Sequence, residues 1–150
     1  MTRYVTKEMN RFLELHALEL QINKIRIVNR YLADYEKYMQ VLNFLNSYIG
    51  TIEKYIHKAY ITNGEQVPLF VIIGSIVEIQ DISTQKKHIL MIKKPDVEYA
   101  TTVENSSYED VPFLSATGRS LLFKEVGQDL ILYEGEANEF IGKIERIDYI

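Results

Sequence analysis

The residues that could carry chemistry in this chain do not form a catalytic pattern. The sequence has no glycine-rich phosphate loop and no Gly-x-Ser-x-Gly nucleophile elbow. It has no cysteine, and its three histidines are scattered, so no metal site is indicated. Ser115 lacks the support of a histidine and an aspartate and is better explained as a helix N-cap. We therefore expect that the chain by itself catalyses nothing.

The composition is that of an ordinary soluble protein with one domain or two small ones. The chain has 150 residues and a net charge of −4, and it is long enough to bury a hydrophobic core. Basic residues exceed acidic ones in residues 1–60, and the balance reverses in residues 61–150. This asymmetry favours two different partner surfaces, or simply two ordinary solvated faces. No apolar run could span a bilayer, and no signal peptide is evident, so we expect a cytoplasmic protein without a membrane partner.

Residues 1–60 have the pattern of an antiparallel helical hairpin, or coiled coil. Two proline-free runs place apolar side chains at alternating three- and four-residue steps, the spacing of a seam between packed helices. A break at residues 29–34 separates the runs, and Asp34 is a favourable N-cap for the second helix. The expected seam consists of Leu15, Leu18, Ile22, Ile25 and Leu32 in the first run and Tyr38, Leu42, Leu45, Ile49, Ile52 and Ile56 in the second. The apolar residues outside this seam are expected to dock on the second domain or on another copy of the chain: Leu20, Ile27, Val28, Tyr48 and Tyr55.

Residues 61–68 form the expected linker to a second domain, residues 69–150. The linker contains the Asn-Gly and Pro signals of a loop. An apolar, β-branched run follows it and leads into a strand that ends at Asp81. A short turn and a returning strand at residues 88–92 complete a β-hairpin.

The rest of the second domain is expected to add strands to this hairpin. Residues 96–110 are polar and acidic, which is typical of a loop, with a short strand near residues 99–103. The final strand, residues 139–149, loses its alternation at residues 144–146, which indicates a β-bulge. The pattern predicts a small α+β domain of several antiparallel strands and one short helix.

The stretch from Ser115 to Tyr133, SATGRSLLFKEVGQDLILY, is the most informative part of the sequence. Ser115 and Thr117 are both natural N-caps for a short helix. Gly127 is suited to the positive φ angle that follows such a helix. Residues 130–133 have the composition of a strand.

This stretch resembles the C-terminal domain of the bacterial Gre family of transcription elongation factors, GreA and GreB. The family has roughly Ser-Pro-x-[Ala/Gly]-Arg-[Ala/Gly]-Leu-x-Gly-Lys-x-x-Gly-Asp, then two strands and a Val-x-Tyr-like tail. This chain supplies Ser115, Gly118, Arg119, Leu121, Lys124, Gly127 and a tail of Ile147-Asp148-Tyr149-Ile150, and departs from the pattern at Ala116, Phe123 and Gln128. The resemblance implies an FKBP-like fold for residues 69–150.

The resemblance extends more loosely to the hairpin, which in Gre factors enters the secondary channel of RNA polymerase. In cleavage-competent members its tip carries two acidic residues, thought to hold a second Mg²⁺ in the polymerase active centre so that a bound water can attack the RNA. Aligned from Gly50, Asp34 matches the second acid and Tyr38 the family tyrosine. Tyr31 stands where the first acid should be, and Glu36 lies out of register. One carboxylate should hold the metal poorly, and a plain N-cap is the favoured role of Asp34.

The resemblance predicts a regulatory Gre-like factor that binds RNA polymerase, with weak or no stimulation of transcript cleavage. The first helix is about nine residues shorter than in the family, or roughly 13 Å of reach, which also favours this interpretation. We expect no cofactor of its own apart from Mg²⁺ in the polymerase active centre. We also expect contact with nascent RNA, DNA binding, and a monomer or weak oligomer. Partner contacts are expected at Asp34, Glu36, Ser115, Gly118 and Arg119.

Two other functions remain open. The Gre-type domain could be a binding module for another partner, as in the regulators of nucleoside diphosphate kinase, which have a shorter helical arm. The FKBP-like fold also suggests a peptidyl-prolyl isomerase. That analogy rests on fold alone, and the chain has no tryptophan for the floor of an isomerase pocket.

Overall fold

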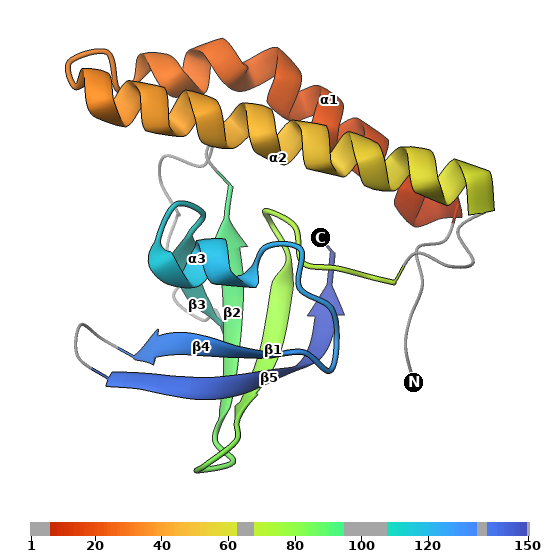
Figure 1. Cartoon of the computed structure of the whole chain (residues 1–150), viewed down its shortest axis with the longest axis vertical. Helices are drawn as coiled ribbons and strands as arrows, with labels where there is room; N and C mark the ends of the chain where they lie inside the picture. The colour runs from red at the N-terminus through yellow and green to blue at the C-terminus, as the bar shows by residue number, and fades with distance from the viewer. Residues whose placement is uncertain (1–6, 63–67, 95–107, 135–137, 150) are drawn as a thin grey trace. The chain divides into compact units, whose positions relative to one another are not determined.

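The computed structural model describes residues 7–62, 68–94, 108–134 and 138–149. The chain divides into two compact units, Met1–Pro68 and Leu69–Ile150, and each is described by itself (Figure 1). No helix among the described residues is long and apolar enough to cross a membrane. The prediction of a short strand near residues 99–103 lies outside the described residues.

The first unit is the expected antiparallel helical hairpin. It consists of α1 (Lys7–Asn29) and α2 (Tyr35–Thr62), which lie side by side (Figure 1). Residues 30–34 form the turn at the tip, where the N–H groups of Arg30, Tyr31 and Leu32 bond to carbonyl groups of the last turn of α1. The break between the two helices therefore lies within the predicted residues 29–34.

The face of α1 that packs is not the predicted one. The expected seam residues Leu15, Leu18, Ile22 and Ile25 are 55–70% exposed, and Leu32 is 66% exposed. We call these five residues the outer stripe. Their burial was wrongly predicted, because a second stripe on α1 forms the buried face: Asn10, Leu13, His16, Ala17, Leu20, Ile27 and Val28.

For α2 half of the predicted seam residues are buried. Its buried face includes three of the predicted residues together with two others: Leu45, Ile49 and Ile52, with Val41 and Tyr48. Tyr48 and, on α1, Leu20, Ile27 and Val28 were expected outside the seam, yet all four are buried. The two helices therefore pack through part of the predicted face of α2 and through a stripe of α1 that was not predicted to pack.

A buried polar pair joins the two helices. Nε2 of His16 lies 2.7 Å from the hydroxyl oxygen of Tyr48, and the two rings meet edge to face with centroids 5.7 Å apart. Nearer the tip, Nζ of Lys24 donates a hydrogen bond of 2.9 Å to the side-chain oxygen of Asn46. Because a buried polar group costs free energy unless it is paired, the contact of His16 with Tyr48 favours one register of α1 on α2.

The second unit is a curled five-stranded sheet with one short helix (Figure 1). The strand order is β3-β2-β1-β5-β4. The pairs β1–β2, β1–β5 and β4–β5 are antiparallel, whereas β3 lies parallel to β2, so the predicted α+β domain is confirmed with a mixed sheet. The elements are β1 (Ile76–Asp81), β2 (Lys87–Lys93), β3 (Glu109–Pro112), α3 (Ala116–Leu121), β4 (Asp129–Glu134) and β5 (Asn138–Asp148).

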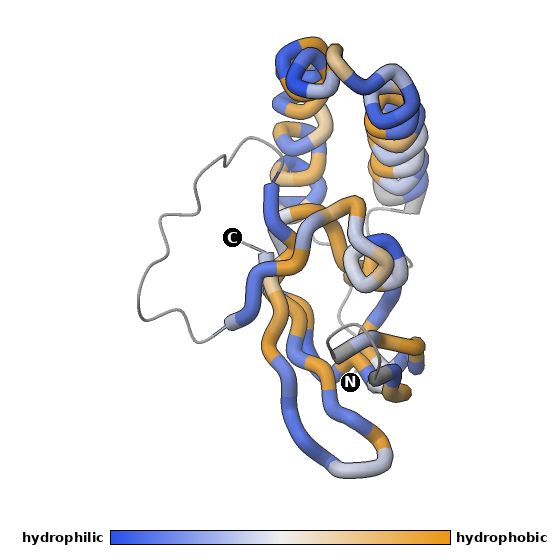
Figure 2. Tube along the Cα trace, turned by 90° about the vertical axis from the view of Figure 1, so that its left-hand side faces the viewer, coloured by the Kyte–Doolittle hydropathy of each residue, from blue (hydrophilic) through white to orange (hydrophobic). Residues whose placement is uncertain are grey.

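The predicted β-hairpin is formed by β1 and β2. Burial alternates along β1, where Val77, Ile79 and Asp81 point into the unit. Figure 2 shows that both strands carry hydrophilic and hydrophobic segments, as expected for strands with one buried and one solvated face. The sheet is therefore built on the period-2 pattern of its sequence.

The predicted β-bulge in the final strand is confirmed. Glu78 of β1 pairs with Arg146, and the next residue, Ile79, pairs with Ile144. Glu145 is consequently the extra residue of β5, since two residues on that strand oppose one step on β1.

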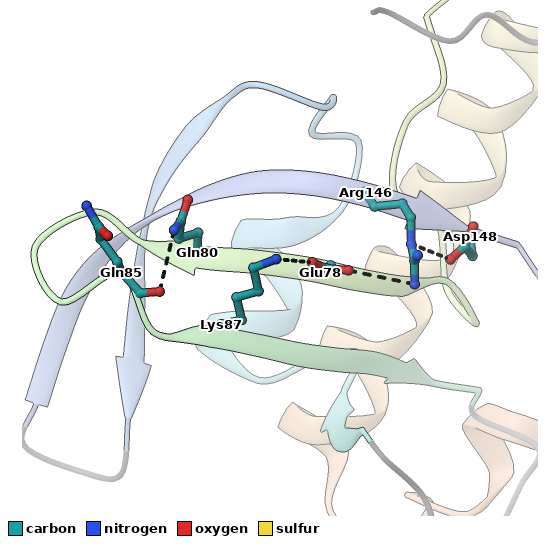
Figure 3. A network of polar contacts seen from close by, with 6 residues as sticks. All are labelled: Glu78, Gln80, Gln85, Lys87, Arg146 and Asp148. Atoms are coloured by element: carbon teal, nitrogen blue, oxygen red, sulfur yellow. Dashed lines mark hydrogen bonds and ion pairs between the residues drawn. The ribbon is translucent and has the colours of Figure 1, made fainter.

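A polar network crosses β2, β1 and β5 near this bulge (Figure 3). One carboxylate oxygen of Glu78 lies 3.4 Å from Nζ of Lys87, and the other lies 3.7 Å from the guanidinium of Arg146. Arg146 also binds Asp148 at 2.9 Å. The lysine and arginine side chains are more than half exposed, so each pair contributes little alone and the network chiefly aligns the three strands.

The turn after α3 is confirmed at Gly127, which has a φ of +91° as predicted. A second residue, Phe123, also has a positive φ, of +67°. Its N–H donates a hydrogen bond to the carbonyl oxygen of Val71 at 2.8 Å, and Val71 N–H donates to Lys124 at 2.9 Å. This turn thus holds the buried run at residues 69–73, which lies outside the named strands.

Candidate functional site

The second unit contains a cleft of about 180 Å³ between the sheet and the turn that leads into α3. Strands β2 and β3 supply one side of it, and β4 and β5 the other. The residues that carry its chemistry are His88, Glu109, Asp110, Ser115, Tyr133 and Phe140. All of them belong to the unit Leu69–Ile150.

His88 provides a polar group inside this cleft. Its ring stacks on Phe140, with the centroids 4.8 Å apart and the planes 24° from parallel. Its Nε2 is buried and has no hydrogen-bond partner among the described residues. A buried polar atom without a partner costs about 1–3 kcal/mol.

The rim of the cleft is acidic, whereas its inner wall is apolar. Glu109 and Asp110 are exposed and line the cleft from β3. Leu90 and Leu132 line it from buried positions in β2 and β4. The accessible lining of the cleft is more polar than apolar, and its acidic rim suits a basic or amide-bearing segment of a partner.

Ser115 lies at this cleft and is the N-cap of α3, as predicted. Its Oγ accepts a hydrogen bond of 3.0 Å from the N–H of Gly118. The same hydroxyl donates a hydrogen bond of 2.7 Å to the carbonyl oxygen of Pro112. The hydroxyl is engaged in the local fold, so a capping role accounts for Ser115.

Gly118 and Arg119 are neighbours in α3 but lie in different surroundings. Gly118 is buried, and a Cβ there would collide with the carbonyl oxygen of Pro112. Arg119 is exposed in the last turn of α3. A requirement for close packing therefore explains the glycine, and the surface position of Arg119 leaves its guanidinium accessible to a partner.

The tip of the hairpin carries the other predicted site residues. Asp34 is exposed, and its Oδ1 accepts a hydrogen bond of 3.1 Å from the N–H of Lys37, so it caps α2. Glu36 is exposed in the first turn of α2, and Tyr31 is half-buried. Within the described residues no group of three histidine, aspartate or glutamate side chains could hold a metal ion. The role of Asp34 in a shared metal site stays a prediction.

The sequence reasoning missed the cleft. His88, Phe140 and Tyr133 lie on three different strands, and only the register of the sheet brings them together. One signal was present: His88, Leu90 and Ile92 alternate along β2, which places a histidine on the apolar face of that strand.

No protein-family model matches the chain, and no curated protein matches it. Among solved structures, the chain is similar to GreA factor homolog 1 (Gfh1) of Thermus thermophilus, with 19% identity, 96% of this chain and 95% of that chain covered, and a TM-score of 0.45. It is also similar to Gfh1 of Thermus aquaticus, with 18% identity, 95% and 96% covered, and a TM-score of 0.45. A third is the transcription elongation factor GreA/GreB from Nitrosomonas europaea, with 21% identity, 57% and 66% covered, and a TM-score of 0.41.

These proteins are of the type that the sequence motifs resemble. The TM-scores lie below 0.5, so these similarities are not used to infer a function.

Proposed function

We propose that this chain is a Gre-like regulator that binds RNA polymerase at its secondary channel and modulates elongation, with little or no stimulation of transcript cleavage. The observation that carries the proposal is the tip of the α1–α2 hairpin. There Asp34 alone matches the two acids that the Gre resemblance calls for, and its carboxylate already caps α2.

The hairpin has the form of an arm that enters a channel. The 28 residues of α2 extend about 42 Å at 1.5 Å per residue. The buried contact of His16 with Tyr48 and the contact of Lys24 with Asn46 join α1 to α2 at two levels. Such an arm can carry its tip into a partner without folding anew on binding, which would cost ordering entropy.

The chemistry of the tip favours occupation of a channel over catalysis in it. Mg²⁺ is a hard cation that prefers carboxylate oxygens, and a neutral phenol such as that of Tyr31 is a poor replacement. The first carboxylate of the family pair is missing, and Oδ1 of Asp34 is engaged by Lys37 N–H. We therefore infer that the tip holds a second metal ion weakly.

The second unit supplies the docking surface in this proposal. The cleft beside Ser115, with Glu109 and Asp110 on its rim, suits a basic or amide-bearing segment at the entrance of the channel. Arg119 is exposed on α3 and adds a positive charge to the surface of the same helix. In this proposal the docking surface holds the chain on the polymerase, and the tip alters elongation.

The proposal is tested with tagged full-length chain and core RNA polymerase from the same host. Retention of polymerase at low salt is the expected result. On backtracked complexes the chain should release little cleaved RNA, and Tyr31→Asp should raise the cleavage rate because it restores the missing first carboxylate. Tyr35→Asp is the matched control, since it adds the same charge at an exposed tip residue outside the aligned position. Absence of retention would overturn the proposal.

The alternative is a Gre-type binding module with a partner other than polymerase, as in the regulators of nucleoside diphosphate kinase. The 23-residue length of α1 favours it, because such regulators have a shorter helical arm. Retention of a different protein by the full chain, with no polymerase, would support this alternative. A prolyl isomerase assay on a proline peptide tests the remaining analogy, and activity there would contradict both binding functions.

A further inference from the structure

Helix α1 carries two apolar faces, and the hairpin buries only one of them. The buried stripe packs within the hairpin. The outer stripe is exposed between residues 15 and 25 of α1 and, at Leu32, in the turn that follows the helix. Monomeric soluble proteins rarely expose a contiguous apolar patch larger than a few hundred Å². The outer stripe is therefore a candidate interface.

We propose that the outer stripe pairs with the same stripe of a second copy of this chain, with the two α1 helices antiparallel. Its steps of three and four residues are the a and d positions of a heptad pattern, the spacing of a seam between two long helices. A stripe that meets its own copy forms an isologous interface with twofold symmetry. Two hairpins so paired make a four-helix assembly.

The charges beside the stripe select the orientation. A parallel, in-register pair would place Glu14 next to Glu19 of the second copy, which is a like-charge contact. An antiparallel pair in which Ile22 meets Ile25 of the second copy instead brings Glu19 to Arg26 of that copy, and by symmetry Arg26 to its Glu19. Glu19 and Arg26 are both exposed, and opposite charges at these flanking positions set partner orientation in coiled coils.

The same charges also select the register. Sliding the antiparallel pair by one heptad would bring Ile22 to Leu18 of the second copy and Glu19 to Glu19 of that copy, again a like-charge contact. In the proposed register Ile22 and Ile25 of the two copies meet at the centre of the seam, and Leu18 meets Asn29 of the second copy at the end of α1. Arg26 also has an interaction within its own chain, and in the dimer its guanidinium would make both contacts.

The size of the seam indicates a weak dimer. The helical part of the outer stripe, residues 15 to 25, extends about 15 Å at 1.5 Å per residue. A single seam of this length is smaller than the standard specific interface of about 800 Å² per partner. Antiparallel pairing places the two tips, each with its Asp34, at opposite ends of the assembly. The pairing would form whether or not the chain binds polymerase.

Sedimentation equilibrium of the full chain over a range of concentrations tests the proposal. A monomer–dimer equilibrium is expected for the natural sequence, and the double substitution Ile22→Glu/Ile25→Glu should abolish it. The matched control is Ile131→Glu/Ile141→Glu, which changes an exposed isoleucine pair on β4 and β5 and should leave the equilibrium unchanged. A natural chain that stays monomeric, or dimers that survive the α1 substitutions, would overturn the proposal.

Charge reversal tests the register. Glu19→Arg alone and Arg26→Glu alone should each weaken self-association roughly tenfold at low salt, because two symmetric contacts become repulsive. The double reversal should restore it. Single reversals without effect, or a double variant as weak as the singles, would contradict the proposed register.

A distance measurement tests the orientation directly. The chain has no cysteine, so Arg11→Cys provides a single attachment point for a spin label on an exposed position of α1. In the antiparallel dimer the two labelled positions lie roughly 37 Å apart along the helix axis, whereas in a parallel dimer they lie about 10 Å apart. The short distance would overturn the antiparallel arrangement.

Discussion

The hydroxyl group of Tyr149 donates a hydrogen bond of 2.6 Å to the main-chain carbonyl oxygen of Phe70, which lies 79 residues earlier in the chain. The contact ties the end of the last strand to the buried run that begins the second unit. Burial raises the pKa of the Tyr149 phenol well above its ordinary value. The phenol therefore stays protonated and keeps its donor role throughout the neutral pH range.

Tyr149→Phe should lower the free energy of unfolding by about 1 kcal/mol, because it removes one partly buried hydrogen bond and leaves the ring in place. Urea unfolding with an unchanged m value is the measurement. Tyr133→Phe is the control, since Tyr133 is 47% exposed and should change stability by less than about 0.5 kcal/mol. Equal effects of the two substitutions would contradict the assigned role of the contact.

Phe123 is under backbone strain that a glycine would relieve. Its φ of +67° is uncommon for a bulky residue, and the Gre pattern usually has glycine there. Its ring lies 5.9 Å from that of Phe70, so removing the ring costs packing in any variant. Phe123→Gly should therefore be more stable than Phe123→Ala by about 1 kcal/mol. Thermal unfolding of the two variants gives the difference in stability. Equal stability of the alanine and glycine variants would contradict backbone strain at residue 123.

Gly118→Ala and Gly50→Ala should have opposite effects. A Cβ at position 118 would collide with the Pro112 carbonyl, whereas one at position 50 meets nothing within 4 Å. We expect a loss of about 2 kcal/mol for the first, as in other overpacked sites. The second should gain about 0.5–1 kcal/mol from helix propensity. Chemical denaturation of both variants checks the pair, and a neutral Gly118→Ala would show that the turn before α3 can yield.

Asp81 should make the free energy of unfolding depend on pH. Burial alone would raise the pKa of its carboxyl group, but hydrogen bonds from the Ser83 hydroxyl and from the N–H groups of Ser83 and Thr84 outweigh burial and lower that pKa. A lowered pKa in the folded state adds stability above the unfolded value of about 3.9. That stability is lost as the pH falls through the folded pKa.

The substitution Asp81→Asn tests this dependence. The variant should unfold at lower denaturant concentration than the natural chain at pH 7, and the difference should shrink at pH 3. Circular dichroism during urea titration at both pH values is the measurement. A difference that stays constant between them would show that the ionised carboxylate has no special role.

Two roles of Asp34, helix capping and its negative charge, can be tested separately. Asp34→Ala should destabilise the hairpin by about 1 kcal/mol, whereas Asp34→Asn should cost little, because asparagine also caps helices well. Thermal unfolding monitored at 222 nm reports both. If the asparagine variant is stable but loses its effect on the elongation rate of polymerase, the carboxylate acts on the partner. If it keeps that effect, the cap alone explains the residue.

Much of the local structure could be predicted from the sequence, because short-range forces decide it. The Ser115 cap and the positive φ of Gly127 depend on hydrogen bonds and steric contacts within a few residues. The bulge of β5 appears as a break in a period-2 pattern. The two helices follow from long proline-free runs and a capping residue between them.

Packing decided what those patterns left open. Helix α1 has two stripes with the same 3–4 spacing, and the fully buried one contains polar residues, Asn10 and His16, which made it look like the exposed face. The hairpin can bury His16 because Tyr48 of α2 satisfies it, and Asn46 binds Lys24 at the edge of the stripe. Neither partner can be identified before the two helices are in register. The cleft around His88 arises in the same way, since strands β2, β4 and β5 meet only through the sheet. The sequence by itself thus determined most of the elements, although it missed β3 and placed the end of α2 too early. Only the tertiary structure decided which faces meet, because the free energy of burying a polar side chain depends on the partner that satisfies it.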